Sequence, residues 1–209
     1  MTDVLEAITA SRLLPVVVID DARAAPPLAA ALRRGGLCCA EVTLRTPAAE
    51  AAIRAMAADP GMVVGAGTVL NAAQAARAID AGARYIVTPG FSLQVVRHCQ
   101  ARSVPVFPGI ATASELMAAL DEGIETVKFF PAEPLGGVSM LKALAAPFSM
   151  MRFIPTGGIT AANLGGYLSH PAVVAVGGSW MVATGLLKAG DFDEVSRLTA
   201  EAVSLAAAG

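Results

Sequence analysis

Short apolar, β-branched runs recur along the chain at intervals of roughly 20 to 27 residues, and helical patterns fill the gaps between them. Repeated βα units require parallel strands with helices between them. Such a chain folds either as a closed (β/α)8 barrel or as an open doubly wound sheet. The predicted strands are Leu14–Ile19, Cys38–Leu44, Met62–Ala66, Arg84–Thr88, Val104–Phe107, Thr126–Phe129, Arg152–Thr156 and Val173–Val176.

The number of repeats and their even spacing favour the barrel. A dinucleotide-binding sheet would carry G-x-G-x-x-G after an early strand, whereas Gly65-Ala66-Gly67-Thr68 has only the first two glycines of that pattern. We therefore predict an α/β fold, a (β/α)8 TIM barrel made by one domain over residues 1–209. An extra N-terminal helix over Val4–Arg12 is expected to close the bottom of this barrel.

Helix-capping signals lie between the predicted strands. Thr112-x-x-Glu115 predicts a reciprocal cap at the start of one helix. Thr46-Pro47 predicts another helix start, with Thr46 as the cap and the proline in the first helical position.

Composition excludes several classes of protein. Of the 209 residues, 55% are hydrophobic and 15% charged, which excludes a disordered or coiled-coil chain. The net charge of −2 argues against a nucleic-acid partner or a polybasic membrane surface. Acidic Asp3 and Glu6 stand where a signal peptide would be basic, and glycine and proline interrupt the uncharged stretch Phe153–Leu187. We therefore expect a soluble, cytoplasmic protein without a membrane span.

Cysteine and histidine spacing predicts no metal site. Adjacent Cys38 and Cys39, with Cys99 alone, match neither a disulfide framework nor a zinc pattern, and the pair is predicted to be small core residues. His98 and His170 lie far apart in the sequence and are predicted to lie on the surface.

Lys128 is the strongest candidate for catalysis. Side chains alternate along a strand, so Lys128 shares a face with Thr126 and Phe130, opposite Val127 and Phe129. Burial disfavours the charged form of a lysine, and the free amine is the form that attacks carbonyls in Schiff-base catalysis. The same pattern also fits a lysine that extends to solvent or one that neutralises a buried acid.

The segment 41–45 places three polar side chains, Glu41, Thr43 and Arg45, on one face of a strand. Arg45, at the strand's end, can hold a carboxylate or phosphate through two hydrogen bonds. Glu41, deeper in the strand, can transfer protons beside the lysine. A structural ion pair of Glu41 with Arg45 or Lys128 is the alternative.

Three glycine-rich segments each follow an apolar run: Gly65–Thr68, Thr156–Ile159 and Gly177–Trp180. After the seventh and eighth strands of such barrels, backbone N–H groups commonly bind phosphate, and glycine lets the main chain approach the anion. The last two segments therefore predict a phosphate site. Thr68 either donates its hydroxyl to substrate or caps the following helix, and Trp180 is interpreted as packing.

Together these motifs resemble the 2-keto-3-deoxy-6-phosphogluconate aldolase family, many bacterial members of which also cleave 4-hydroxy-2-oxoglutarate. The resemblance covers nearly the whole chain in order. It implies a (β/α)8 barrel and a metal-independent, cofactor-free Schiff-base lyase of the Entner–Doudoroff pathway, usually a homotrimer. The motifs that carry it are Glu41–Thr46, Gly65–Asn71, Val127–Glu133, Pro155–Ile159 and Gly177–Trp180.

The resemblance also implies a role for each matched residue. Lys128 would be the Schiff-base nucleophile and Glu41 the general acid/base. Arg45 and Thr68 would hold the carboxylate of the pyruvyl group of the keto acid. The groups expected to bind the phosphate of the sugar acid are Gly157, Gly158, Gly178 and Ser179.

The sequence departs from the family pattern in two places. Asp20-Asp21 follows the first strand where relatives often carry basic residues, so the sequence does not fix the sign of the charge at the rim of the site. Ala161 replaces a common proline.

Two alternative functions are consistent with the same motifs: an aldolase for the galactonate-derived sugar acid phosphate, and a non-catalytic sugar-phosphate-binding barrel.

Overall fold

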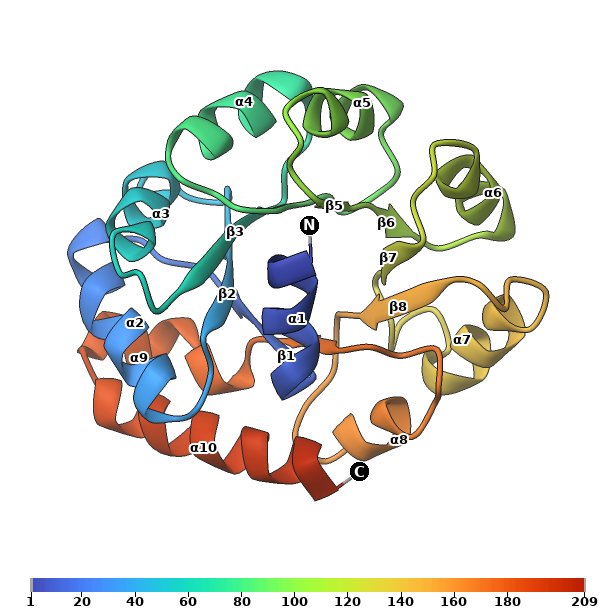
Figure 1. Cartoon of the computed structure of the whole chain (residues 1–209). Coiled ribbons are helices and arrows are strands. Elements are labelled where there is room, and N and C mark those ends of the chain that lie inside the picture. The colour runs from blue at the N-terminus through green and yellow to red at the C-terminus, as the bar shows by residue number, and fades with distance from the viewer. Residues whose placement is uncertain (1, 209) are drawn as a thin grey trace.

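Parallel strands form a curled sheet, and helices lie around its outside (Figure 1). The computed structural model describes residues 2–208. The strands are β1 (Leu13–Val17), β2 (Cys39–Thr43), β3 (Val63–Gly67), β4 (Ile86–Val87), β5 (Val106–Phe107), β6 (Gly109–Ile110), β7 (Thr126–Phe129), β8 (Arg152–Pro155) and β9 (Val176–Gly178).

The helices alternate with the strands, as the βα pattern predicts, and the long C-terminal helix α10 packs against α2 and α8. Short 3₁₀ turns cover Ala22–Ala24 and Trp180–Val182. The helices are α1 (Thr2–Ser11), α2 (Ala25–Arg34), α3 (Ala49–Ala57), α4 (Ala72–Asp80), α5 (Leu93–Ala101), α6 (Ala113–Asp121), α7 (Gly137–Ala145), α8 (Leu164–Leu168), α9 (Thr184–Ala189) and α10 (Phe192–Ala208).

The strands pair in two groups, ordered β5-β4-β3-β2-β1-β9 and β6-β7-β8. Two isolated parallel bridges join the β8 and β9 segments: Phe153 of β8 pairs with Val173, before β9, and Thr156, after β8, pairs with Gly177 of β9. Each predicted strand has a counterpart, and the fifth, Val104–Phe107, corresponds to β5. The short strand β6, at Gly109–Ile110, was not predicted. Pro108 separates β5 from β6, because proline has no N–H to donate to a neighbouring strand.

The bounds predicted for the last strand are wrong. Val173 makes only an isolated bridge, and β9 begins at Val176 and includes Gly177 and Gly178, which pair with Leu14 and Pro15 of β1. The glycines were expected in the loop after the strand. They lie in the strand itself, because glycine leaves the space that neighbouring side chains occupy.

The capping predictions divide into one that is confirmed and one that is wrong. Thr112 and Glu115 form a complete capping box at the start of α6. Thr46 does not cap α3, which begins at Ala49; its hydroxyl instead donates a 2.5 Å hydrogen bond to the carbonyl of Ile19. Thr46 therefore ties the β2–α3 loop to the loop after β1.

The predicted N-terminal helix is confirmed as α1, which lies across the middle of the ring of strands in Figure 1. It contributes to a small apolar cluster inside the curled sheet, separate from the larger core between sheet and helices. The buried members of the inner cluster are Val4, Ile8, Leu14, Cys39, Tyr85, Val87, Phe107, Ile154 and Ala175. One end of the interior is therefore filled with apolar side chains.

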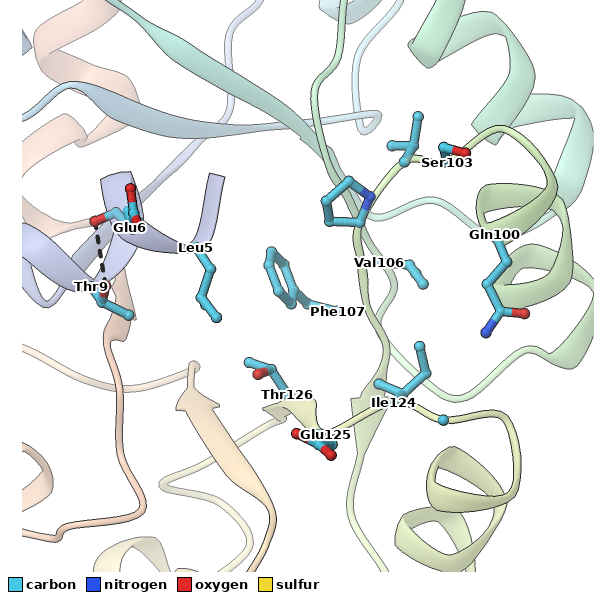
Figure 2. Close-up of a pocket in the computed structure, with 13 residues that line it drawn as sticks. Leu5, Glu6, Thr9, Gln100, Ser103, Val106, Phe107, Ile124, Glu125 and Thr126 are labelled. Carbon is cyan, nitrogen blue, oxygen red and sulfur yellow. Dashed lines mark hydrogen bonds between the residues drawn. The ribbon is translucent and has the colours of Figure 1, made fainter. Parts of the chain in front are cut away.

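A hollow of about 980 Å³ lies beside α1, at the end of the sheet where β5 and β7 begin (Figure 2). Leu5 and Phe107 line it, together with Glu6 and Glu125. Among the described residues that line it there is no lysine or arginine. None of the predicted site residues lies in this hollow.

Several predictions for cysteine and histidine need correction. Cys39 and Cys99 are buried, but Cys38 is exposed, because neighbouring residues on a strand edge point in opposite directions. The histidines are half-buried rather than on the surface. The Nε2 atom of His98 is buried without a hydrogen-bond partner among the described residues, and His170 Nδ1 accepts a bond from the N–H of Ala172.

No helix within residues 2–208 combines the length and the apolar composition needed to cross a bilayer.

The burial of the thiols predicts selective alkylation. Burial raises the pKa of Cys39 to about 12 and that of Cys99 to about 11. Because the thiolate is the reactive form, iodoacetamide at about pH 8 should label the folded protein once, on Cys38. Peptide mass spectrometry before and after unfolding checks this, and modification of Cys99 in the folded protein at the rate of Cys38 would contradict the burial described here.

Candidate active site

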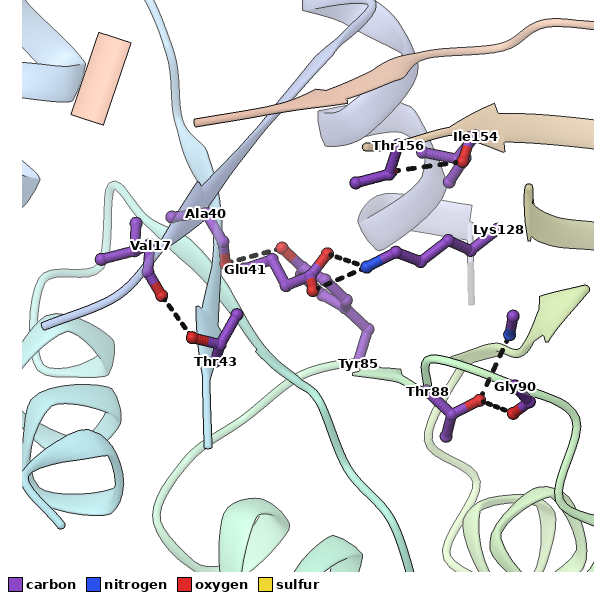
Figure 3. A network of polar contacts seen from close by, with 11 residues as sticks. Val17, Ala40, Glu41, Thr43, Tyr85, Thr88, Gly90, Lys128, Ile154 and Thr156 are labelled. Carbon is purple, nitrogen blue, oxygen red and sulfur yellow. Dashed lines mark hydrogen bonds and ion pairs between the residues drawn. The ribbon is translucent and has the colours of Figure 1, made fainter. Parts of the chain in front are cut away.

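Lys128 of β7 and Glu41 of β2 meet inside the curled sheet (Figure 3). The lysine Nζ lies 3.1 Å from Oε1 and 3.5 Å from Oε2 of the carboxylate. The two side chains are 8% and 1% exposed. Both residues therefore point inward, as the alternation of their strands predicts, and they form a buried ion pair although 87 positions separate them in the sequence.

Two glycines of β3 make room for this pair and for a neighbouring tyrosine. A side-chain carbon on Gly67 would lie 2.0 Å from Glu41 Oε1, and one on Gly65 would lie 2.1 Å from the ring of Tyr85. Any larger residue at either position would force these groups apart. The predicted strand Met62–Ala66 includes Gly65 and stops before Gly67. In the structure both glycines belong to β3, where they act by their lack of a side chain.

Tyr85 is a member of this region that sequence reasoning missed. Its hydroxyl donates a 2.6 Å hydrogen bond to the carbonyl of Ala40, next to Glu41. Complete burial raises the pKa of Tyr85 well above its usual value, so the phenol remains a donor. The signal that could have found it is the pair of glycines inside a strand, which indicates a large neighbour.

The second of the three polar residues predicted on one strand face, Thr43, has a structural role. It is the last residue of β2, so Arg45 lies in the turn after the strand and not on its face. The hydroxyl of Thr43 donates a 2.8 Å hydrogen bond to the carbonyl of Val17, which ties β2 to β1. Thr43 is buried in that contact and is satisfied there.

A pocket of about 490 Å³ opens where β1, β8 and β9 end, the end of the sheet opposite the apolar hollow. Arg45 is the one charged residue among those that line it, and Phe130 extends from it toward the lysine, whose Nζ lies 5.2 Å from the ring centre. The predicted phosphate-binding residues all line this pocket: Gly157, Gly158, Gly178 and Ser179. The structure thus brings together groups from three separate segments of the chain.

Thr68 is not among the residues that line this pocket. It follows Gly67 directly at the end of β3 and has a left-handed backbone, with φ of 55°. A threonine in this region of φ is strained, and tertiary contacts must hold it there. It does not cap α4, because Asn71 accepts the hydrogen bond from Gln74 N–H at that helix start.

The glycine loop after β8 has a backbone that other residues adopt poorly. Gly157 and Gly158 have φ of 105° and 81°. Gly178 makes room for an aromatic ring, because a side-chain carbon there would lie 1.8 Å from the ring of Trp180. Trp180 was interpreted as packing only. It does pack on the core, but together with Thr156 it also lines the pocket.

The acidic residues after β1 are paired with cations. Asp20 lies 3.1 Å from Nζ of Lys188, and Asp21 lies 2.7 Å from the guanidinium of Arg23. Hydrogen bonds from Arg23 lower the pKa of the Asp21 carboxyl below its ordinary value. These pairs offset the negative charge near the end of β1. Asp20 and Asp21, which stand where relatives often carry basic residues, are therefore both paired with cations.

Within residues 2–208 no three histidine, cysteine, aspartate or glutamate side chains gather in a way that could hold a metal ion. The site is instead built from one amine, one carboxylate, one guanidinium and glycine-rich backbone. This is a donor set for carbonyl and anion chemistry.

Comparison with known proteins identifies the family. The family model "KDPG and KHG aldolase" matches residues 4–198. The 2-dehydro-3-deoxy-phosphogluconate aldolase of Treponema pallidum is 50% identical over 208 residues, covering 98% of each chain.

Two solved structures have the same fold. The 2-keto-3-deoxy-6-phosphogluconate aldolase of Zymomonas mobilis, determined with 3-phosphoglycerate, is 43% identical with a TM-score of 0.92, covering 98% of this chain and 97% of its own. The KDPG aldolase of Legionella pneumophila, with pyruvate captured as a covalent carbinolamine, is 39% identical with a TM-score of 0.91, covering 94% and 96%. This chain belongs to the KDPG and KHG aldolase family.

Proposed function

We propose that this protein is a metal-independent Schiff-base aldolase, a carbon–carbon lyase that cleaves 2-keto-3-deoxy-6-phosphogluconate to pyruvate and D-glyceraldehyde 3-phosphate. The observation that carries the proposal is the buried contact between Lys128 and Glu41. Family membership supports it, as does the covalent pyruvate adduct of the Legionella relative. The same chemistry applies to 4-hydroxy-2-oxoglutarate, which yields pyruvate and glyoxylate.

Lys128 attacks the C2 ketone of the substrate. Glu41 lies 3.1 Å from the lysine nitrogen, close enough to accept the proton that nitrogen must lose before it attacks. Glu41 then returns protons as the carbinolamine loses water and becomes an iminium ion. The cationic iminium withdraws electrons, so breaking the C3–C4 bond leaves a neutral enamine.

A base removes the proton of the C4 hydroxyl as that bond breaks, and D-glyceraldehyde 3-phosphate leaves. Glu41 then protonates the enamine carbon, and hydrolysis of the resulting imine releases pyruvate and restores the lysine. One buried carboxylate therefore serves several proton transfers around a single amine.

The substrate's two anionic ends have separate binding groups in this proposal. Arg45, in the pocket, and Thr68, at the end of β3, hold the pyruvyl carboxylate. The main chain of Gly157, Gly158 and Gly178, with the hydroxyl of Ser179, receives the phosphate. Backbone N–H groups bind a phosphate well because they point at it without a side chain in between.

We also propose that the sheet closes into a (β/α)8 barrel that forms one domain. Residues 106–110 support closure because they carry both β5 and β6. β5 pairs with β4 in the first strand group and β6 pairs with β7 in the second, so this one short segment joins the two groups. The Thr156–Gly177 bridge supports the other seam.

A homotrimer is the proposed assembly, and the cytoplasm the proposed location. Three exposed apolar side chains support self-association, because such groups are stabilised when a partner covers them: Leu70 in the loop before α4, Leu93 of α5 and Met117 of α6.

Trapping tests the proposed nucleophile. Incubation with pyruvate and borohydride should reduce the imine and leave a stable adduct on Lys128, seen by peptide mass spectrometry. Lys128→Arg keeps the positive charge and should give no adduct, because a guanidinium forms no such imine. The exposed Lys142→Arg is the matched control and should react like the unaltered protein. A folded, unmodified protein would point to a non-catalytic sugar-phosphate-binding barrel instead.

Replacing the acid tests its part in proton transfer. Glu41→Gln keeps the shape of the side chain, so kcat should fall about a hundredfold or more while thermal unfolding still shows one folded domain. Thr43→Val, on the same face of β2, removes the buried hydroxyl that bonds Val17 and should lower stability with little change in kcat. Equal activity of Glu41→Gln and unaltered protein would exclude Glu41 as the acid/base.

Substrate preference tests the phosphate site and the choice of epimer. The value of kcat/KM for 2-keto-3-deoxy-6-phosphogluconate should exceed that for 4-hydroxy-2-oxoglutarate by about tenfold or more, because only the former places a phosphate on the glycine loops. Steady-state rates on the galactonate-derived epimer are measured beside them. Faster cleavage of that epimer would assign the chain to the galactonate-type activity.

A further inference from the structure

Glu133 and Tyr167 are joined by a hydrogen bond that the proposed reaction does not use. Tyr167 lies on α8, is 1% exposed, and donates its hydroxyl to Oε1 of Glu133. Glu133 comes five positions after Lys128, in the loop that follows β7. The contact therefore connects the lysine's own loop with the helix that follows the glycine loop of β8.

The backbone beside this contact holds the glycine loop directly. The N–H of Glu133 donates to the carbonyl of Gly157 at 3.0 Å, and the N–H of Ala132 donates to that of Thr156 at 2.8 Å. These bonds continue the pairing of β7 with β8 beyond the last paired residues of the two strands. The loop that lines the pocket is thus hydrogen-bonded to the segment that carries Glu133.

Glycines also surround the pair closely. A side-chain carbon on Gly158 would lie 2.7 Å from Cβ of Glu133. One on Gly137 would lie 3.0 Å from Oε1 of Glu133 and 3.2 Å from the hydroxyl of Tyr167. Gly158 and Gly137 both have positive φ, so the chain bends tightly around the contact from two sides.

We propose that Glu133 and Tyr167 are positioning residues, which hold Gly157 and Gly158 in the backbone conformation that receives the phosphate of the substrate. The inference rests on the proposed function, because it takes the glycine loop as the phosphate site. Neither side chain touches the reacting carbons in this assignment. They act on the affinity for the phosphate end of the ligand and leave the amine chemistry at Lys128 unchanged.

A hydrogen bond to a charged acceptor is stronger than one between neutral groups. When one partner of a buried hydrogen bond is removed, the other is left unsatisfied and the folded structure is destabilised. Tyr167→Phe removes the donor and keeps the ring that packs in the core. Glu133→Gln removes the charge and keeps an oxygen that accepts the same bond. Tyr167→Phe therefore tests the hydrogen bond without changing the packing of the ring, and Glu133→Gln tests the charge without removing the acceptor.

The chain offers an internal probe and a matched control for this test. Trp180, the one tryptophan, lines the pocket, so its fluorescence reports ligand binding there. Thr199 of α10 also buries its hydroxyl in a hydrogen bond, which it donates to the carbonyl of Val195 at 2.7 Å, and it does not line the pocket. Thr199→Val therefore controls for the loss of a buried hydroxyl as such.

The experiment titrates the full-length protein with 3-phosphoglycerate and follows Trp180 fluorescence. We expect Tyr167→Phe to raise the Kd about fivefold or more, and Glu133→Gln and Thr199→Val to change it less than about twofold. In steady-state assays Tyr167→Phe should raise KM for the phosphorylated substrate and leave kcat/KM for 4-hydroxy-2-oxoglutarate unchanged. A role in folding alone would instead affect both substrates equally.

Several results would overturn the inference: an unchanged Kd in Tyr167→Phe, equal increases in Tyr167→Phe and Thr199→Val, or no binding of 3-phosphoglycerate by the unaltered protein. Borohydride trapping of pyruvate on the same samples keeps the two proposals apart. An adduct on Lys128 with an unchanged Kd refutes only the positioning role, whereas the absence of an adduct in the unaltered protein refutes the aldolase itself.

Discussion

Lys128 and Glu41 place two charged groups almost entirely inside a curled sheet of apolar strands. Removing such groups from water costs several kcal/mol for each ion, and their attraction offsets this only when the contact is short. A chain under selection for stability alone gains more from apolar residues of similar size. The rest of the site adapts to this pair: Gly67 leaves space for the carboxylate, and Tyr85 fixes the backbone of β2 at Ala40, the position before the acid.

The two ends of the sheet have different properties as a consequence. Where the strands begin, α1 and the inner cluster fill the interior with apolar side chains, and the nearby hollow has carboxylates but no cation. Where β8 and β9 end, the pocket of the same sheet is lined by Arg45, the glycine loop after β8, the glycines of β9 and Trp180. The two ends therefore differ in charge, because only the second pocket has a cationic side chain among its lining residues.

Sequence periodicity was sufficient to show which residues share a face of the strand with Lys128 and with Glu41, because side chains on a strand alternate whatever the strand pairs with. It was insufficient for Thr43 and Thr46, whose hydroxyls bond the carbonyls of Val17 and Ile19. Those carbonyls belong to another strand and its loop, so no local pattern contains them. Gly67 of β3 and the two glycines of β9 lie beyond the predicted strand ends for a similar reason, because the side chain that fills the space beside each comes from another part of the chain.

The sequence by itself determined the alternation of strands and helices, the α/β class and the residues able to do carbonyl chemistry, because these follow from apolar periodicity and side-chain type over short spans. Only the tertiary structure decided that Lys128 contacts Glu41 rather than solvent, that Arg45 faces the glycine loops, and that Glu133 meets Tyr167. Each of these contacts joins residues from different βα units. Their geometry depends on how the sheet curls, which is a property of all the strands together.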